Sequence, residues 1–111
     1  MAATVRLIAT LVLGVLAACL LCMPLRAQET GEAIFKAKCA MCHGPDASGK
    51  TVMGEKLQVP DLHSDQIQKK SDAELRDAIT KGKGKMPAYE GKLTKEQIDK
   101  VVAYIRALPK H

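Results

Sequence analysis

The sequence contains few aromatic residues: its 111 positions include no Trp, one Phe and two Tyr. A small domain with so little bulky apolar material cannot build a large core from its own side chains. We therefore expect a further apolar body to complete the core. The short chain also excludes large architectures such as a TIM barrel or a doubly wound nucleotide-binding domain.

Acidic residues are missing from the first 27 positions, where 21 residues are apolar. Arg6 precedes a long uncharged run that ends before Pro24. A basic start followed by such a run is typical of a secretory signal peptide. We predict that residues 1–27 are a signal peptide cleaved after Ala27, and that residues 28–111 form the mature domain.

Two alternatives to simple cleavage remain open. The sequence Leu16-Ala17-Ala18-Cys19 resembles a bacterial lipobox, which would make Cys19 a lipidated N-terminus. Residues 7–25 are also marginally long enough to span a bilayer as an uncleaved anchor. The chain stays apolar after Cys19, which favours simple cleavage over lipidation. All three interpretations export the domain, and we expect a periplasmic location, an oxidising compartment in which free thiols need a reason to exist.

A strong excess of one charge is also absent from the mature domain. Its 15 basic residues are interleaved with 12 acidic ones. Nucleic-acid-binding domains concentrate basic residues on one face or along one helix. We therefore expect no nucleic-acid partner.

The mature domain lacks the alternation of apolar and polar residues that marks a β-strand. Capping-box patterns at 71–74 and 94–97 predict the starts of two helices, and residues 32–38 favour a short helix before Cys39. The segments 44–54 and 83–92 are rich in Gly and Pro, which predicts loops. We predict an all-α domain with three to four short helices joined by long loops.

The most specific motif is Cys39-Ala40-Met41-Cys42-His43, the C-x-x-C-H pattern of covalent c-type haem attachment. Two thiols one helical turn apart can add to the two vinyl groups of one porphyrin. The adjacent His43 can then bind the iron as the proximal ligand. The motif predicts one covalent haem c, attached through Cys39 and Cys42, and the porphyrin would supply the missing apolar body.

Three other interpretations of the motif are weaker. A thioredoxin-like redox pair would need a βαβ context that the sequence does not offer. A plain disulfide between Cys39 and Cys42 leaves His43 unexplained. A zinc site with His63 as the fourth ligand is possible by residue count, but contiguous Cys and His rarely both point at one tetrahedral ion.

The sixth iron ligand must come from outside the attachment motif. The candidates are Met53, Met86, His63 and His111. Met86 is favoured because it follows two glycines in a loop and is fixed by Pro87 just after it. A thioether ligand raises the reduction potential, which suits an electron carrier. We expect His63 to be exposed and His111 to lie at a frayed end.

The sequence resembles the small bacterial class I cytochromes c from Gly31 to Leu108. The matching residues are Gly31, Phe35, Cys39 to Gly44, Pro60-Asp61-Leu62, Met86-Pro87 and Ala103-Tyr104-Ile105. The resemblance implies the small cytochrome c fold wrapped around one haem, with the first and last helices of the domain crossing near Gly31 and Phe35. Val101 and Tyr104 would lie on the other side of this crossing. It also implies that the carbonyl of Pro60 accepts a hydrogen bond from the second ring nitrogen of His43.

With His43 and Met86 both bound, the iron has no open position for a substrate. We therefore predict a monomeric one-electron carrier between redox proteins, and not an enzyme. The alternative is a haem sensor or peroxidase-like domain in which Met86 is a labile ligand.

A basic rim is expected around the loop that carries Met86. Lys81, Lys83 and Lys85 flank this residue, and we predict that they steer docking onto acidic redox partners. The plain alternative is a solvated loop. Membrane association is expected only if the N-terminus is retained or lipidated.

Overall fold

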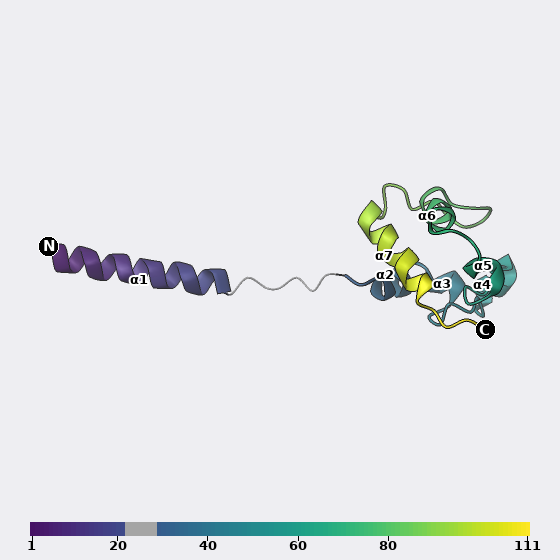
Figure 1. Ribbon diagram of the computed structural model, residues 1–111, viewed down its shortest axis with the longest axis horizontal. Coiled ribbons are helices and arrows are strands. Elements are labelled where there is room, and N and C mark those ends of the chain that lie inside the picture. Colours follow the sequence, from purple (N-terminus) through teal and green to yellow (C-terminus); the bar gives the residue numbers. More distant parts are fainter. Residues whose placement is uncertain (22–28) are drawn as a thin grey trace.

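The computed structural model describes residues 1–21 and 29–111, and these residues contain helices but no β-strand (Figure 1). The helices are α1 (Ala2–Leu21), α2 (Gly31–Lys38), α3 (Ala40–His43), α4 (Val52–Leu57), α5 (Asp65–Gln68), α6 (Asp72–Lys81) and α7 (Lys95–Arg106). The predicted all-α fold is confirmed. Two of the six helices of the domain are only four residues long.

α1 is a long apolar helix that lies apart from the others in Figure 1. The stretch Ala2–Cys19 is long and apolar enough to cross a membrane, and all its side chains are exposed. A secretory signal and a membrane anchor both have this property. The predicted cleavage point after Ala27 lies outside the described residues.

The helix starts predicted from capping patterns are confirmed. The Ser71 hydroxyl accepts from the Glu74 backbone N–H at the start of α6, while the Glu74 carboxylate accepts from the Ser71 N–H. Thr94 and Gln97 form the same reciprocal pair at the start of α7. Each box satisfies two backbone donors that the helix itself leaves unpaired.

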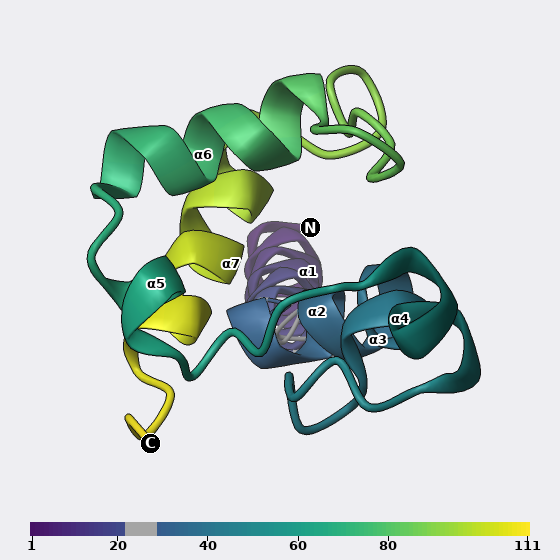
Figure 2. The same ribbon diagram turned by 90° about the vertical axis from the view of Figure 1, so that its right-hand side faces the viewer.

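α2 and α7 cross in direct contact, and Gly31 makes this crossing possible (Figure 2). A Cβ at Gly31 would lie 2.1 Å from the Lys100 carbonyl oxygen and 3.2 Å from the Tyr104 Cβ. Phe35, one turn further along α2, packs against Tyr104 with ring centroids 5.1 Å apart. The resemblance implied that Gly31 and Phe35 contact Tyr104, and the structure shows both contacts.

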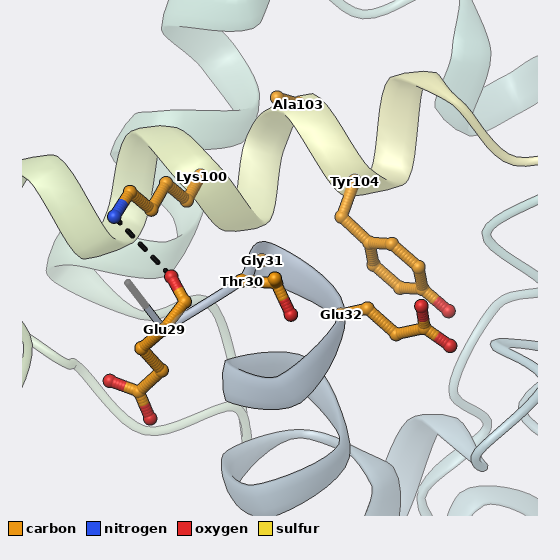
Figure 3. Close-up of a pocket in the computed structure, with 7 residues that line it drawn as sticks. All are labelled: Glu29, Thr30, Gly31, Glu32, Lys100, Ala103 and Tyr104. Atoms are coloured by element: carbon orange, nitrogen blue, oxygen red, sulfur yellow. Dashed lines mark hydrogen bonds between the residues drawn. The ribbon is translucent and has the colours of Figure 1, made fainter. Parts of the chain in front are cut away.

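A shallow pocket opens beside this crossing (Figure 3). Its lining residues are Glu29, Thr30, Gly31, Glu32, Lys100, Ala103 and Tyr104. The Lys100 ammonium reaches across it and donates to the Glu29 carbonyl at 3.3 Å. The residues of the C-x-x-C-H motif do not line this pocket.

The core is small and mostly aliphatic. Its buried members are Ile34, Phe35, Ala47, Leu62, Ile67, Leu75, Ile79, Leu93, Ile98, Val101, Val102 and Ile105. Phe35 is its one fully buried aromatic side chain among the described residues. This composition agrees with the scarcity of aromatic residues in the sequence.

Two short helices, α4 and α5, were not predicted from the sequence. α4 begins inside the predicted loop 44–54, because Thr51 caps it by accepting from the Gly54 N–H at 2.8 Å. Gly54 is buried at this point, and a Cβ there would lie 2.2 Å from the Gly49 carbonyl oxygen and 2.5 Å from that of Cys42. α5 is a single turn between two longer elements.

Candidate haem-binding site

The C-x-x-C-H motif forms one turn of helix at the end of α2. Cys39 is both the last cap of α2 and the first cap of α3. Its carbonyl accepts from the N–H groups of Cys42 at 3.3 Å and His43 at 3.0 Å. Side chains three apart on a helical turn lie on the same face, so the backbone presents the two thiols side by side with His43 directly after them.

Both motif cysteines are free thiols and half-buried. Burial, and then the neighbouring Cys42, raises the pKa of the Cys39 thiol to about 11. Redox-active C-x-x-C pairs do the opposite and lower the pKa of the attacking thiol. The site is therefore unlike a thiol–disulfide exchange centre.

The His43 side chain is half-buried, 6.1 Å between ring centroids from Phe35. Burial lowers its pKa, which favours the neutral imidazole that binds metals. Its Nδ1 is buried and has no hydrogen-bond partner among the described residues. Native proteins rarely leave a buried nitrogen unpaired, so this orphaned atom marks a site where the chain alone is incomplete.

The hydrogen bond expected between His43 and the Pro60 carbonyl is not formed. The Pro60 carbonyl oxygen instead lies beside Gly49, 3.4 Å from where a Cβ on that glycine would be. Gly49 in turn donates its N–H to the His43 carbonyl at 2.7 Å. Pro60 therefore lies next to the loop that supports the backbone of His43, and its carbonyl is not bonded to the His43 ring in this structure.

The loop after His43 holds the motif in place through backbone carbonyls. Besides the bond from Gly49, the Thr51 hydroxyl donates to the Cys42 carbonyl at 2.8 Å. The carbonyls at the end of a short helix have no partner within the helix and need such donors. These two hydrogen bonds fix the backbone of the turn through its carbonyls, so they leave the side chains of the motif available to a ligand.

Met86 lies in a tight turn that returns to α6. Lys83 and Met86 exchange two backbone hydrogen bonds, of 3.2 and 3.0 Å. Gly82 has φ +75°, and a Cβ there would lie 2.6 Å from the Met86 carbonyl oxygen. Only a glycine allows this close return. Met86 itself is half-buried and packs against the core.

Tyr89 connects the Met86 loop to the haem-attachment motif. Its hydroxyl donates to the Lys38 carbonyl at 2.9 Å, directly before Cys39. Its own N–H donates to the Ile79 carbonyl at 3.0 Å, near the end of α6. Cys39, Met86 and Tyr89 all pack against the same core cluster. The structure thus places the loop of one predicted ligand against the segment that carries the other.

The remaining candidate ligands are less suited to the role. Met53 lies on α4 with 40% of its surface exposed. His63 is only 8% exposed, so the expectation of an exposed side chain is wrong. Both its ring nitrogens face backbone carbonyls, at 2.6 and 2.7 Å. His111 stacks on His63 with ring centroids 4.4 Å apart instead of fraying freely.

The same contacts argue against the zinc interpretation. A zinc site of the predicted type requires His63 together with the motif residues. Each ring nitrogen of His63 lies at hydrogen-bond distance from a backbone carbonyl, so this imidazole could bind a metal only by breaking one of these contacts.

Comparison with known proteins agrees with the fold. The family model for cytochrome c oxidase, cbb3-type, subunit III matches residues 26–105. The chain is 36% identical over 83 residues to the cbb3-type cytochrome c oxidase subunit FixPc of Rhizobium leguminosarum bv. viciae, covering 72% of this chain and 27% of that protein. It is 35% identical over 77 residues to cytochrome c6 of Microcystis aeruginosa, covering 69% of this chain and 91% of that protein.

A solved structure shares the fold. The KustC0563 c-type cytochrome superposes with a TM-score of 0.68 at 29% sequence identity, over 73% of this chain and 99% of that one. Fold and motif together define a class I cytochrome c domain. The chain belongs to the cytochrome c oxidase, cbb3-type, subunit III family, although it spans only about a quarter of the length of the FixPc subunit.

Proposed function

We propose that the domain at 28–111 is a one-electron carrier with one haem c attached through Cys39 and Cys42. His43 and Met86 are its iron ligands. The observation that carries the proposal is the helical turn with two free thiols and a half-buried imidazole, whose pKa is lowered by burial and whose Nδ1 has no partner among the described residues. The domain-sized similarity to cytochrome c6 supports the same function.

The bound haem supplies a reversible Fe(III)/Fe(II) couple. The chain's residues keep the ligation constant between the two states and exclude water. The glycine-closed turn at Met86 and its Tyr89 link to Lys38 restrict the movement of the thioether. These contacts of the Met86 turn favour a carrier over a sensor or a peroxidase-like enzyme with a labile ligand.

We infer that the protein works outside the inner membrane, in the periplasm. The apolar helix α1 supports export, either as a signal cleaved after Ala27 or as a retained anchor. The lipobox ending at Cys19 is a third form of the same targeting. The domain acts as a monomer in each case, and its distance from the membrane depends on which form is present.

The basic rim around Met86 is the proposed docking surface for acidic redox partners. Lys83 and Lys85 are exposed on the turn that holds Met86. Lys81 is partly neutralised by an ion pair with Asp77 at 2.9 Å. We therefore assign the steering mainly to Lys83 and Lys85.

Haem attachment is tested by expressing the Cys39→Ser and Cys42→Ser variants with the export machinery intact. Each should lose covalent loading in part and the double variant completely, measured as haem that stays with the chain after denaturation. Cys19→Ser is the matched control and should load haem normally. Full loading of the double variant would refute the proposed attachment site.

A further inference from the structure

His63 makes two hydrogen bonds that a neutral imidazole cannot make together. Its Nδ1 lies 2.6 Å from the Pro109 carbonyl oxygen and its Nε2 lies 2.7 Å from the Asp46 carbonyl oxygen. Both partners are carbonyl oxygens, which only accept. A neutral imidazole carries one N–H, whereas the imidazolium carries two. Both bonds are therefore complete only when His63 is protonated.

The two carbonyls belong to segments far apart in the sequence. Asp46 follows the proposed iron ligand His43 by three residues, and Pro109 lies beyond the end of α7. Both segments run along the lower side of the domain in Figure 2. The Gly49 N–H in the same loop donates to the His43 carbonyl. His63 thus connects the loop that supports the haem-attachment turn to the C-terminal segment.

We propose that His63 is a proton-dependent clasp between two segments. As the imidazolium it joins the Asp46 loop to the Pro109 segment, and when it loses its proton it releases one of them. In the neutral form, one ring nitrogen would direct its lone pair at a carbonyl oxygen at hydrogen-bond distance. That contact is repulsive, so one of the two segments must move away. The clasp is a property of the folded chain and is independent of the haem chemistry proposed above.

The charged groups around His63 favour the protonated form. Asp61 accepts from the His63 backbone N–H with one carboxylate oxygen, at 2.8 Å, and its other oxygen lies 3.8 Å from the His111 ring. The Asp46 carboxylate is bonded to Ser48, which lowers its pKa and keeps it ionised. The His111 ring stacks on His63 and would oppose its charge when protonated. The bonds to the Asp46 and Pro109 carbonyls, followed by the two carboxylates, raise the pKa of His63.

The direction of the pH effect follows from this shift. The folded chain binds the His63 proton more tightly than the unfolded chain does. The clasp therefore stabilises the fold fully below the unfolded pKa, and its contribution is lost as the pH rises through the higher folded pKa.

A metal site is the competing interpretation of the same cluster. One ligand atom each from Asp61, His63 and His111 lie within 4.8 Å of one another. A metal would have to displace one of the carbonyl bonds of His63, since each ring nitrogen already has a partner. The clasp interpretation needs no such rearrangement.

The deciding experiment is a side-chain nitrogen NMR titration of the reduced, purified protein. At pH 6 both His63 ring nitrogens should carry protons, and the titration midpoint should lie above that of an exposed histidine. The His63→Gln variant loses the ring nitrogen signals of His63 and so identifies them in the spectrum of the wild type. His111→Ala is the matched control, because it removes the stacked ring but leaves both carbonyl bonds. A His63 that is neutral at pH 6, with one protonated nitrogen, would overturn the proposal.

Amide exchange gives a second readout that needs no variant. Once corrected for its intrinsic pH dependence, exchange should accelerate about tenfold above the His63 midpoint in the released segment, since that segment loses a hydrogen bond to a charged group. The reporter is Gly49 if the Asp46 loop is released, and Leu108, whose N–H bonds to the Ile105 carbonyl, if the Pro109 segment is released. Exchange at Cys39, whose N–H bonds to Phe35 inside α2, should not change. Equal protection of both Gly49 and Leu108 on the two sides of the midpoint contradicts the clasp. A joint shift of the His63 and His111 signals on adding one equivalent of Zn²⁺ would instead establish a metal site.

Discussion

The Tyr89 hydroxyl donates a 2.9 Å hydrogen bond to the carbonyl of Lys38, 51 positions earlier in the chain. Lys38 is the last residue of α2 and directly precedes Cys39. Tyr89 follows Met86 by three residues in a turn that is bonded back to α6. One side chain therefore fixes the distance between the proposed attachment motif and the loop of the proposed sixth ligand.

Tyr89→Phe removes only this hydroxyl and should loosen the Met86 loop. We expect the free energy of unfolding to fall by about 1 kcal/mol, the usual net value of such a bond. In the oxidised protein, the Met-to-Fe(III) charge-transfer band should disappear at a lower denaturant concentration than in the wild type. Tyr104→Phe is the control, because the described residues show no hydrogen bond from its hydroxyl, and it should leave that midpoint unchanged. An unaltered midpoint in Tyr89→Phe would show that the link does not restrain Met86.

Gly31→Ala should destabilise the crossing of α2 and α7. The new Cβ would lie 2.1 Å from the Lys100 carbonyl oxygen, a backbone atom that cannot rotate away. Forced separation of two packed helices should cost about 2–3 kcal/mol in the free energy of unfolding, measured by urea titration. Glu32→Ala is the neighbouring control. It removes only an exposed ion pair with Lys36 and should cost about 0.5 kcal/mol or less. Equal stability of the two variants would contradict the tight crossing.

Lys83→Glu should slow electron transfer to an anionic oxidant. We expect oxidation of the ferrous protein by ferricyanide at low ionic strength to slow about tenfold, because the local charge changes by two. The difference should shrink as salt is added. Lys69→Glu makes the same change in net charge at the end of α5 and should have a much smaller effect. If the two variants behave alike, the basic rim does not steer docking.

Local sequence signals predicted the elements that depend on local chemistry. The capping boxes at Ser71 and Thr94 need only neighbouring residues, and both are present where the sequence placed them. The glycine and proline around Met86 likewise predicted a turn that presents one side chain. Gly31 was assigned to the helix crossing through the family resemblance, and the structure shows the contact.

The features that the sequence did not predict depend on distant partners. Gly54 lies in the segment predicted to be a loop, but the absence of a side chain lets the carbonyls of Cys42 and Gly49 lie close to it in α4. His63 follows a proline turn and looked exposed, but it is buried between the carbonyls of Asp46 and Pro109. No local pattern encodes such pairings, because they arise when the C-terminal segment folds back onto the domain.

The central claim concerns the two iron ligands and is tested by comparing Met86→Ala with Met53→Ala. Both variants remove a methionine outside the attachment motif, but Met53 lies on the exposed side of α4. Each purified protein would be examined by visible spectroscopy and redox titration. The account predicts c-type haem in the wild type and in both variants. Met86→Ala alone should lose the Met-to-Fe(III) band, with a reduction potential lower by on the order of 100 mV. An unchanged band and potential in Met86→Ala would contradict the account.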